Sequence, residues 1–161
     1  MHEEPHWSVI INSSTCSHRE WKRWKLYLEK NSISFSAYKT DSLEQLSDTL
    51  AGLLENGNMH FLFAGGDGTL HHGGNQLIRL SGEKSKCITI GVLPSGTGND
   101  WARTFGVDKK RLFLSLKEGI SVPLHLIKIT WPDGKERYAF NMVGGALDAA
   151  VVNTLSSSSM N

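Results

Sequence analysis

Two short clusters of glycine carry the residues best suited to chemistry in this chain. Residues 65–69 read Gly-Gly-Asp-Gly-Thr, and residues 96–100 read Gly-Thr-Gly-Asn-Asp. Each cluster follows an apolar run that predicts a strand. Glycine lets a phosphate group approach the backbone closely, and backbone amides at the start of the next helix attract anions. If the two strands are neighbours, the clusters lie side by side and form one nucleotide cleft.

The side chains within the first cluster leave two roles open. The Asp67 carboxylate would repel a bare phosphate. It therefore either binds a Mg²⁺ ion that lies between the carboxylate and the phosphate, or orders the loop by accepting hydrogen bonds from backbone amides. Thr69 supplies a hydroxyl where the helix starts, as a helix cap or as a donor to phosphate. In the second cluster Asp100 is either a participant in phosphoryl transfer or a helix cap.

Two familiar nucleotide-binding motifs are excluded. No GxxxxGK[ST] sequence occurs, so the chain is not a P-loop protein. The dinucleotide fingerprint would need a third glycine at position 101, which is Trp101. Both clusters could also be plain tight turns, but two such clusters at successive strand ends, each with an Asp and a Thr, favour a binding site.

The elements around the clusters predict an α/β fold. Strands alternate with helices, which indicates a mostly parallel sheet with helices on both faces. We expect a capping box at Asp41 and Glu44, and a helix after Thr69 that Gly73 and Gly74 weaken. The expected strands are 7–11, 33–40, 60–64 and 88–93, and the expected helices are 19–30, 41–56, 69–80, 101–105 and 109–117.

The pattern changes near Pro123. A strong turn signal at 131–134 lies between two apolar runs and predicts a β-hairpin instead of another helix. We therefore expect a nucleotide-binding α/β domain at 1–122 and the beginning of a β-rich second domain at 123–161.

Composition excludes several classes of protein. The 161 residues include 17 Lys and Arg against 16 Asp and Glu, and this near-neutral balance argues against a dedicated nucleic-acid binder. No apolar run is long enough to cross a membrane, and the polar, acidic start is unlike a signal peptide. Cys16 and Cys87 form no metal-binding pattern, which indicates reduced thiols and a cytoplasmic protein.

At these motifs the sequence resembles the diacylglycerol kinase-like lipid kinases, a family that includes sphingosine kinases. Residues 61–70 look like the nucleotide loop of that family, although its GGDGT core also occurs in NAD kinases and phosphofructokinases. Residues 92–103 match a pattern more specific to lipid kinases, and residues 141–148 resemble the start of the family's second, β-sandwich domain.

The resemblance implies a phosphofructokinase-like α/β domain and a reaction that uses ATP and Mg²⁺. The γ-phosphoryl group would pass to the hydroxyl of a diacylglycerol-like lipid, so the protein would be peripheral to a membrane surface. Asp67 would take a catalytic role. The residues implied to bind the nucleotide are Asn12, Thr40, Gly65, Gly66, Asp67, Gly68, Thr69, Leu70, His71 and Thr97.

The chain also departs from the family pattern. Ser13 replaces a proline, His71 and His72 replace Asn-Glu, and His125 stands where an Asp is common. The sequence stops where the sandwich domain would barely have begun, and the family's catalytic base and lipid pocket lie in that domain. We therefore expect this chain alone to bind ATP weakly and to transfer little phosphate.

Several alternatives remain open. An NAD kinase-like enzyme and a non-catalytic, degenerate kinase module are the competing functions, and a homodimer is left open. His71 and His72 suggest a metal, but no third ligand is evident, and adjacent helix residues point to different sides. The basic helix at 19–30 could lie on anionic lipid, although Trp21 and Trp24 are more simply its core-facing side chains.

Overall fold

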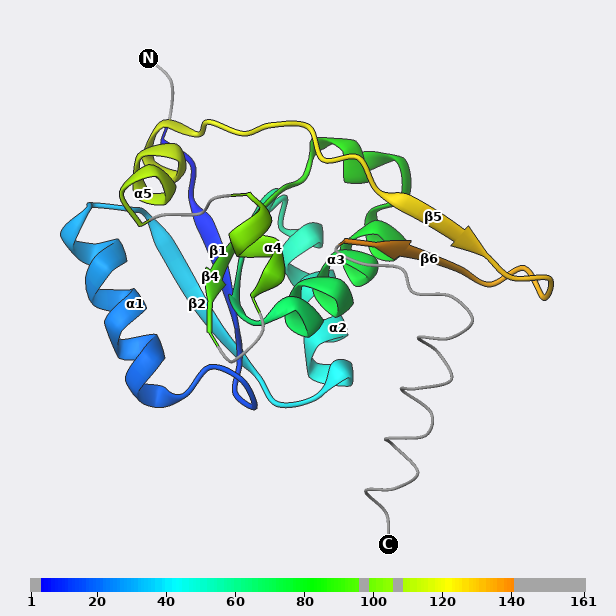
Figure 1. Cartoon of the computed structure of the whole chain (residues 1–161), viewed down its shortest axis with the longest axis horizontal. Coiled ribbons are helices and arrows are strands. Elements are labelled where there is room, and N and C mark those ends of the chain that lie inside the picture. The colour runs from blue at the N-terminus through cyan, green and yellow to red at the C-terminus, as the bar shows by residue number, and fades with distance from the viewer. Residues whose placement is uncertain (1–3, 96–98, 106–108, 141–161) are drawn as a thin grey trace, which may run out of the picture.

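A parallel sheet of four strands lies between two layers of helices, and a β-hairpin follows (Figure 1). The computed structural model describes residues 4–95, 99–105 and 109–140. In chain order the elements are β1 (Trp7–Asn12), α1 (His18–Lys30), β2 (Phe35–Thr40), α2 (Leu43–Glu55), β3 (His60–Gly65), α3 (Asp67–Ser81), the 3₁₀ helix η1 (Gly82–Cys87), β4 (Thr89–Pro94), α4 (Asp100–Thr104), α5 (Lys109–Glu118), β5 (Ile127–Thr130) and β6 (Glu136–Ala139).

The sheet has the strand order β2-β1-β3-β4, and every neighbouring pair is parallel. The central strands β1 and β3 are buried on both sides, as their near-continuous apolar runs require, whereas the edge strand β2 is partly exposed. In β3, Leu62 and Ala64 face the α1/α5 side, whereas Phe61 and Phe63 face the α2/α3 side. The predicted α/β fold with helices on both faces is confirmed.

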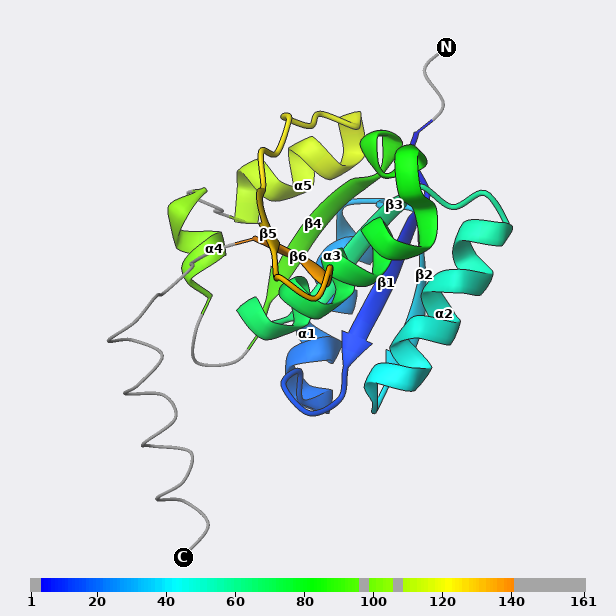
Figure 2. The same cartoon turned by 90° about the vertical axis from the view of Figure 1, so that its right-hand side faces the viewer.

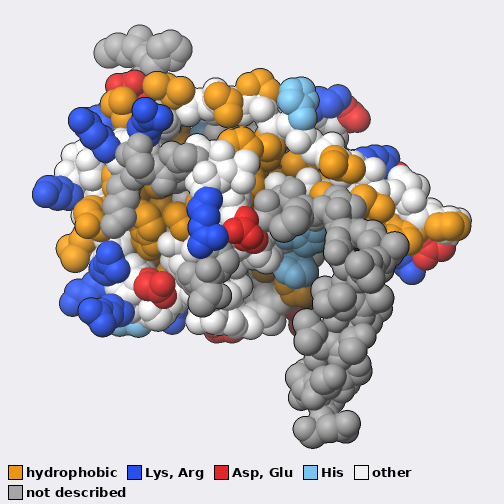
Figure 3. Space-filling view, in the orientation of Figure 1, with side chains coloured by type: hydrophobic (Ala, Val, Ile, Leu, Met, Phe, Trp, Pro, Cys, Tyr) orange, Lys and Arg blue, Asp and Glu red, His pale blue; other side chains and the backbone are white. Residues whose placement is uncertain are grey.

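The layer formed by α1 and α5 is packed with aromatic rings. Trp24 of α1 is buried, and its ring centroid lies 6.5 Å from that of Phe113 in α5. Trp21 is half-buried against Phe35, with 6.2 Å between ring centroids. Both tryptophans therefore pack against the core cluster, as expected. The outside of this layer, at the left of Figure 3, carries many Lys and Arg side chains.

The layer formed by α2 and α3 is packed closely through glycine. A Cβ atom at Gly73 would lie 2.2 Å from Cε1 of Phe63, and one at Gly74 would lie 2.2 Å from Cζ of Phe140. The helix expected to about Leu80 is present, and α3 runs unbroken from Asp67 to Ser81 through both glycines. Their missing side chains let α3 sit directly on aromatic rings, which offsets their low helix propensity. Figure 2 shows α3 in front of the sheet.

The capping of the helices differs from the sequence prediction. Helix α2 is capped by Ser42, whose hydroxyl accepts a hydrogen bond from the Gln45 amide at 3.1 Å, so the predicted cap at Asp41 is wrong by one residue. A full capping box forms at α1 instead, between Ser17 and Glu20. The Ser-x-x-Glu spacing at 17–20 is the signal for this cap.

The predicted hairpin is confirmed, since β5 and β6 pair antiparallel around the turn at 131–134. It packs against α3 through Asn75, whose side chain donates to the Tyr138 carbonyl and accepts from the Tyr138 amide, both at 2.8 Å. The division into domains at 122/123 stays a prediction, and the described part of the second segment packs on the first. Residues 141–148 lie outside the described residues.

Among the described residues, no helix has both the length and the apolar character needed to span a membrane.

Candidate functional site

The carboxyl ends of all four strands meet at one edge of the sheet. Asn12 at the end of β1 lies beside Thr40 at the end of β2, and Gly65 at the end of β3 lies beside Pro94 of β4. Ligands of open α/β sheets bind at this edge. The strand-end residues expected from the sequence are therefore brought together by the topology.

Asn12 links the turn between β1 and α1 to the first turn of α3. Its side-chain amide donates to Thr69 Oγ1 at 2.9 Å, and its carbonyl oxygen accepts from the Ser14 amide at 3.0 Å. Thr69 is buried, and a Cβ atom at Gly65 would come within 2.3 Å of Thr69 Oγ1. The glycine at 65 therefore makes room for the threonine hydroxyl.

Thr69 does not cap α3, so that alternative is wrong. The N-cap of α3 is Gly66, which has no side chain, and the helix already begins at Asp67. The first glycine cluster is thus a tight strand-to-helix junction instead of a long loop. Its Thr69 and Leu70 amides bond the Gly66 carbonyl, whereas the structure shows no acceptor among its described residues for the amides of Asp67 and Gly68.

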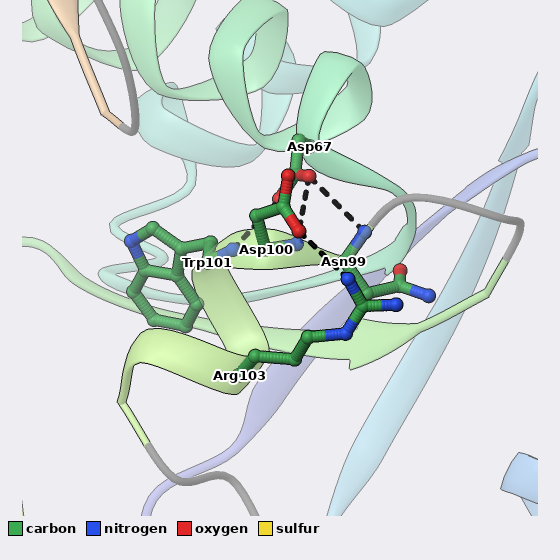
Figure 4. Close-up of polar contacts among 5 residues, drawn as sticks. All are labelled: Asp67, Asn99, Asp100, Trp101 and Arg103. Carbon is green, nitrogen blue, oxygen red and sulfur yellow. Dashed lines mark hydrogen bonds and ion pairs between the residues drawn. The ribbon is translucent and has the colours of Figure 1, made fainter.

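Asp67 joins the two glycine clusters (Figure 4). Its Oδ2 accepts hydrogen bonds from the amides of Asn99 at 3.1 Å and Asp100 at 2.9 Å, and its Oδ1 accepts from the Trp101 amide at 3.0 Å. The carboxylate of α3 therefore satisfies the first amides of α4, which would otherwise lack partners at a helix start. This position also suits a negative charge, because the helix dipole is positive there.

The side-by-side placement of the two clusters is confirmed for their described residues. Besides the Asp67 bonds, the Ser95 amide donates to the Gly65 carbonyl at 3.0 Å. Of the two roles open for Asp67, the amide bonds that order the second loop are present. Asp100 does not cap α4, because Asp67 takes that role and Asp100 pairs with Arg103 at 2.8 Å. Gly96, Thr97 and Gly98 lie outside the described residues.

A pocket of about 190 Å³ opens at this edge, where the ends of β1 and β2 meet the first turns of α2 and α3. Its lining includes hydroxyl, amide and carboxylate groups, two leucines and an imidazole. The lining residues are Asn12, Ser14, Thr40, Asp41, Ser42, Leu43, Leu46, Thr69 and His72.

The sequence predicts part of the lining of this pocket and does not predict the rest. Asn12, Thr40 and Thr69 were expected to contact a nucleotide, and all three line it. Leu70, also expected there, is buried in the core between α2 and α3. The unpredicted part of the lining comes from the start of α2 and from His72 of α3. The residues of α2 reach the pocket only because α2 packs over β2.

The adjacent histidines of α3 differ in their surroundings. His72 lines the pocket, whereas His71 is half-buried and lies near Arg137 of the hairpin. Burial lowers the pKa of His71, and the nearby charges of His72 and Arg137 lower this pKa further. The two rings meet edge to face, with 5.4 Å between centroids. Within the described ranges, no group of three metal-binding side chains forms around them or elsewhere.

The glycine at 68 is the most open point of the first cluster. A Cβ atom there would meet no atom within 4 Å, and the residue is exposed. It lies one residue from Asp67 in the first turn of a 15-residue helix whose first amides face no acceptor in the described chain. An anion can therefore approach these amides without displacing a side chain.

Comparison with known proteins places the chain in a family. The model of the diacylglycerol kinase catalytic domain matches residues 6–129. The chain belongs to this family of lipid kinases. It is 30% identical over 120 residues to "Diacylglycerol kinase" of Staphylococcus saprophyticus, a match that covers 73% of this chain and 36% of that protein. It is 28% identical over 159 residues to "Putative lipid kinase YtlR" of Bacillus subtilis, covering 91% of this chain and 49% of that protein.

The fold comparison agrees with the family. A crystal structure of a diacylglycerol kinase from Bacillus anthracis matches with a TM-score of 0.52 and 19% identity, covering 72% of this chain and 42% of that one. At this identity the match shows the fold alone. The chain spans about half or less of the length of these relatives.

Proposed function

We propose that this chain is the nucleotide-binding part of an ATP-dependent lipid kinase that phosphorylates the hydroxyl of a diacylglycerol-like lipid. The observation that carries the proposal is the pocket, because Asn12, Thr40 and Thr69 were expected at a nucleotide from sequence alone and all three line it. Family membership supports the kinase reaction, since the matching proteins are named as lipid or diacylglycerol kinases.

The pocket suits the nucleoside part of ATP. Leu43, Leu46 and the His72 ring offer the apolar and planar surface that a base needs, while Thr40 and the Asp41 carboxylate face the same space. A carboxylate and a hydroxyl are suitable partners for ribose hydroxyl groups. Among the described residues that line this pocket there is no Lys or Arg, so we place the phosphates outside it.

The phosphates then lie over the first turn of α3. The open backbone at Gly68 and the amides of Asp67 and Gly68 form the anion-binding surface, and Asp67 holds α4 alongside. We propose that Mg²⁺ reaches this surface together with ATP. The three amide bonds leave a lone pair on Asp67 Oδ1, which fits a cation held by one carboxylate, phosphate oxygens and water. When bound, the ion would offset the charge of the phosphates.

The base for the lipid hydroxyl is not assigned to the described residues. The acids of the two clusters are engaged, Asp67 by three amides and Asp100 by Arg103. We propose that the base lies in a region corresponding to the part of the longer relatives with which this chain does not align. Phosphoryl transfer depends mostly on positioning and charge neutralisation, so this chain supplies the donor side.

Calorimetric titration with ATP, with and without Mg²⁺, tests the proposal. Gly68→Glu should abolish ATP binding, because the new carboxylate stands over the phosphate surface, whereas Gly68→Ala should keep most of it. Gly52→Glu is the matched control, since a Cβ at Gly52 also meets nothing within 4 Å and Gly52 stands near the end of α2, away from the first turn that lines the pocket. Equal ATP affinity in Gly68→Glu and Gly52→Glu would overturn this placement, and preference for NAD over ATP would favour an NAD kinase-like function.

A further inference from the structure

Positive charge is concentrated on one side of the molecule. Helices α1 and α5 contain nine of the 17 Lys and Arg but only three of the 16 Asp and Glu, which gives them a net charge of +6. The rest of the chain, with eight basic and 13 acidic residues, carries −5. The net charge of +1 therefore conceals a strongly polar distribution. Both helices cover the same face of the sheet and share one core cluster.

The outward side of α1 is a stripe of cations around a leucine. The stripe consists of Arg19, Lys22, Arg23, Leu26 and Lys30. Each of them stands three or four residues from another member, so they lie on one side of the helix, opposite Trp24 and Leu28. Leu26 is 57% exposed, and all four cations are exposed. Among the described residues, none of these four cations has a carboxylate partner, whereas Lys25 pairs with Glu29.

The outward side of α5 repeats the pattern. Lys110, Leu114 and Lys117 are spaced by four and three residues and are all exposed, and Leu114 is 54% exposed. We call the eight residues of the two stripes the basic face. Figure 3 shows Lys and Arg side chains over this part of the molecule with hydrophobic side chains between them. Exposed leucines at the centre of cationic stripes are typical of helices that lie on a lipid surface.

We propose that the basic face docks on the surface of an anionic lipid bilayer. The cations attract the lipid headgroups, and Leu26 and Leu114 enter the boundary between headgroups and acyl chains. Nucleic acid fits the charge but gives two exposed leucines no apolar partner. This proposal rests on the proposed function, because a lipid kinase must reach its substrate at a membrane surface.

The position of α1 relates the basic face to the candidate site. Helix α1 begins at His18, only six residues after Asn12, so the first turns of α1 lie at the carboxyl edge of the sheet. Arg19, Lys22 and Arg23 belong to those first turns. A bilayer held by them would therefore lie next to the edge where ATP is proposed to bind.

Sedimentation with vesicles tests the docking in the absence of nucleotide. The whole chain should bind vesicles of phosphatidylcholine with 40% phosphatidylglycerol, bind weakly to phosphatidylcholine alone, and lose affinity as salt rises. Arg19→Gln/Lys22→Gln/Arg23→Gln should lower the partition coefficient on the order of 100-fold, from roughly five-fold per cation near an anionic surface. The matched control is Lys39→Gln/Lys84→Gln/Lys135→Gln, which removes three exposed cations outside the basic face and should bind nearly as well as the wild-type chain.

A second variant separates a bilayer from other anionic partners. Leu26→Ser/Leu114→Ser keeps every charge and should reduce vesicle binding about ten-fold or more, while Leu80→Ser/Ile127→Ser removes two exposed apolar side chains elsewhere and should not. Equal vesicle binding by the Arg/Lys triple variant and its control would overturn the proposal. It would also be overturned if a 20-base-pair DNA duplex bound as tightly as the vesicles and the leucine variant left both affinities unchanged.

ATP titration of the same variants separates this inference from the proposed function. The Arg/Lys triple variant should bind ATP like the wild-type chain, because its substitutions lie outside the pocket and the first turn of α3. If the wild-type chain fails to bind the vesicles while it binds ATP, the docking alone is overturned. ATP binding that fails while vesicle binding persists would overturn the nucleotide proposal alone.

Discussion

The two helical layers use opposite means to pack against the same sheet. The α1/α5 layer fills its space with large rings, among them Trp24 and Phe113, and its outside is cationic. The α2/α3 layer places Gly73 and Gly74 against Phe63 and Phe140, and its helices carry one Arg and no Lys against four acids. One layer leaves an outer surface suited to an anionic partner, whereas the other approaches closely enough to form a pocket beside the strand ends.

The largest expected effect on stability comes from removing a buried aromatic side chain from the α1/α5 layer. Trp24→Ala should lower the free energy of unfolding by about 3–5 kcal/mol, because it leaves a cavity between α1 and α5 and removes the indole N–H bond to the Ser95 hydroxyl. Urea denaturation monitored by circular dichroism measures the change. Trp131→Ala, in the exposed hairpin turn, is the control and should change stability by less than about 0.5 kcal/mol. Equal losses in the two variants would contradict the packing of this layer.

In the α2/α3 layer, where glycines contact aromatic rings, the addition of a single methyl group should already lower stability. Gly73→Ala adds one methyl group at 2.2 Å from the Phe63 ring, and such overpacking costs about 1–3 kcal/mol. Gly52→Ala adds the same group to α2 where nothing lies within 4 Å, and should stabilise by about 0.5–1 kcal/mol through helix propensity. The same denaturation experiment compares the two signs. Stabilisation by Gly73→Ala would mean that α3 does not rest on Phe63.

The sequence is sufficient to predict the sheet and much of its functional edge. Apolar runs and glycine clusters mark the four strands and their ends, and parallel strands bring those ends together, so Asn12, Thr40 and the loops of Asp67 and Asp100 were expected as neighbours. The role of Asp67 in ordering a loop follows from the same reasoning, because a carboxylate beside the start of a helix can accept hydrogen bonds from the free backbone amides there.

What the sequence does not reveal depends on contacts between distant elements. Ser42 and Asp41 offer equivalent capping patterns, since Gln45 and Glu44 each stand three residues later, and only the backbone geometry favours Ser42. From the sequence, Gly73 only weakens its helix, and its role in packing is visible only when Phe63 is placed beneath it. His72 reaches the pocket because α3 packs across from α2, and no local spacing records that placement.

The smallest expected effect distinguishes the two layers by their histidines. His60 lies on the α1/α5 side against Trp7, with 5.3 Å between ring centroids, and burial lowers its pKa. His71 lies in the α2/α3 layer, and burial first, then the charges of His72 and Arg137, lower its pKa. A folded-state pKa below the ordinary value means that the unfolded chain binds these protons more tightly. Stability is therefore fully present above about pH 6.5 and is lost as the pH falls below it.

Urea denaturation at pH 7.5 and 5.5 of wild type, His60→Gln and His71→Gln measures this loss, and each substitution should reduce it. Salt then separates the layers, because 0.5 M NaCl screens the charges that act on His71 but does not change burial. The part of the loss that depends on His71 should shrink in salt, while the part that depends on His60 should persist. If both parts shrink equally, then charge and not burial lowers the pKa of His60, and the α1/α5 side is less closed to solvent around Trp7 than its packing indicates.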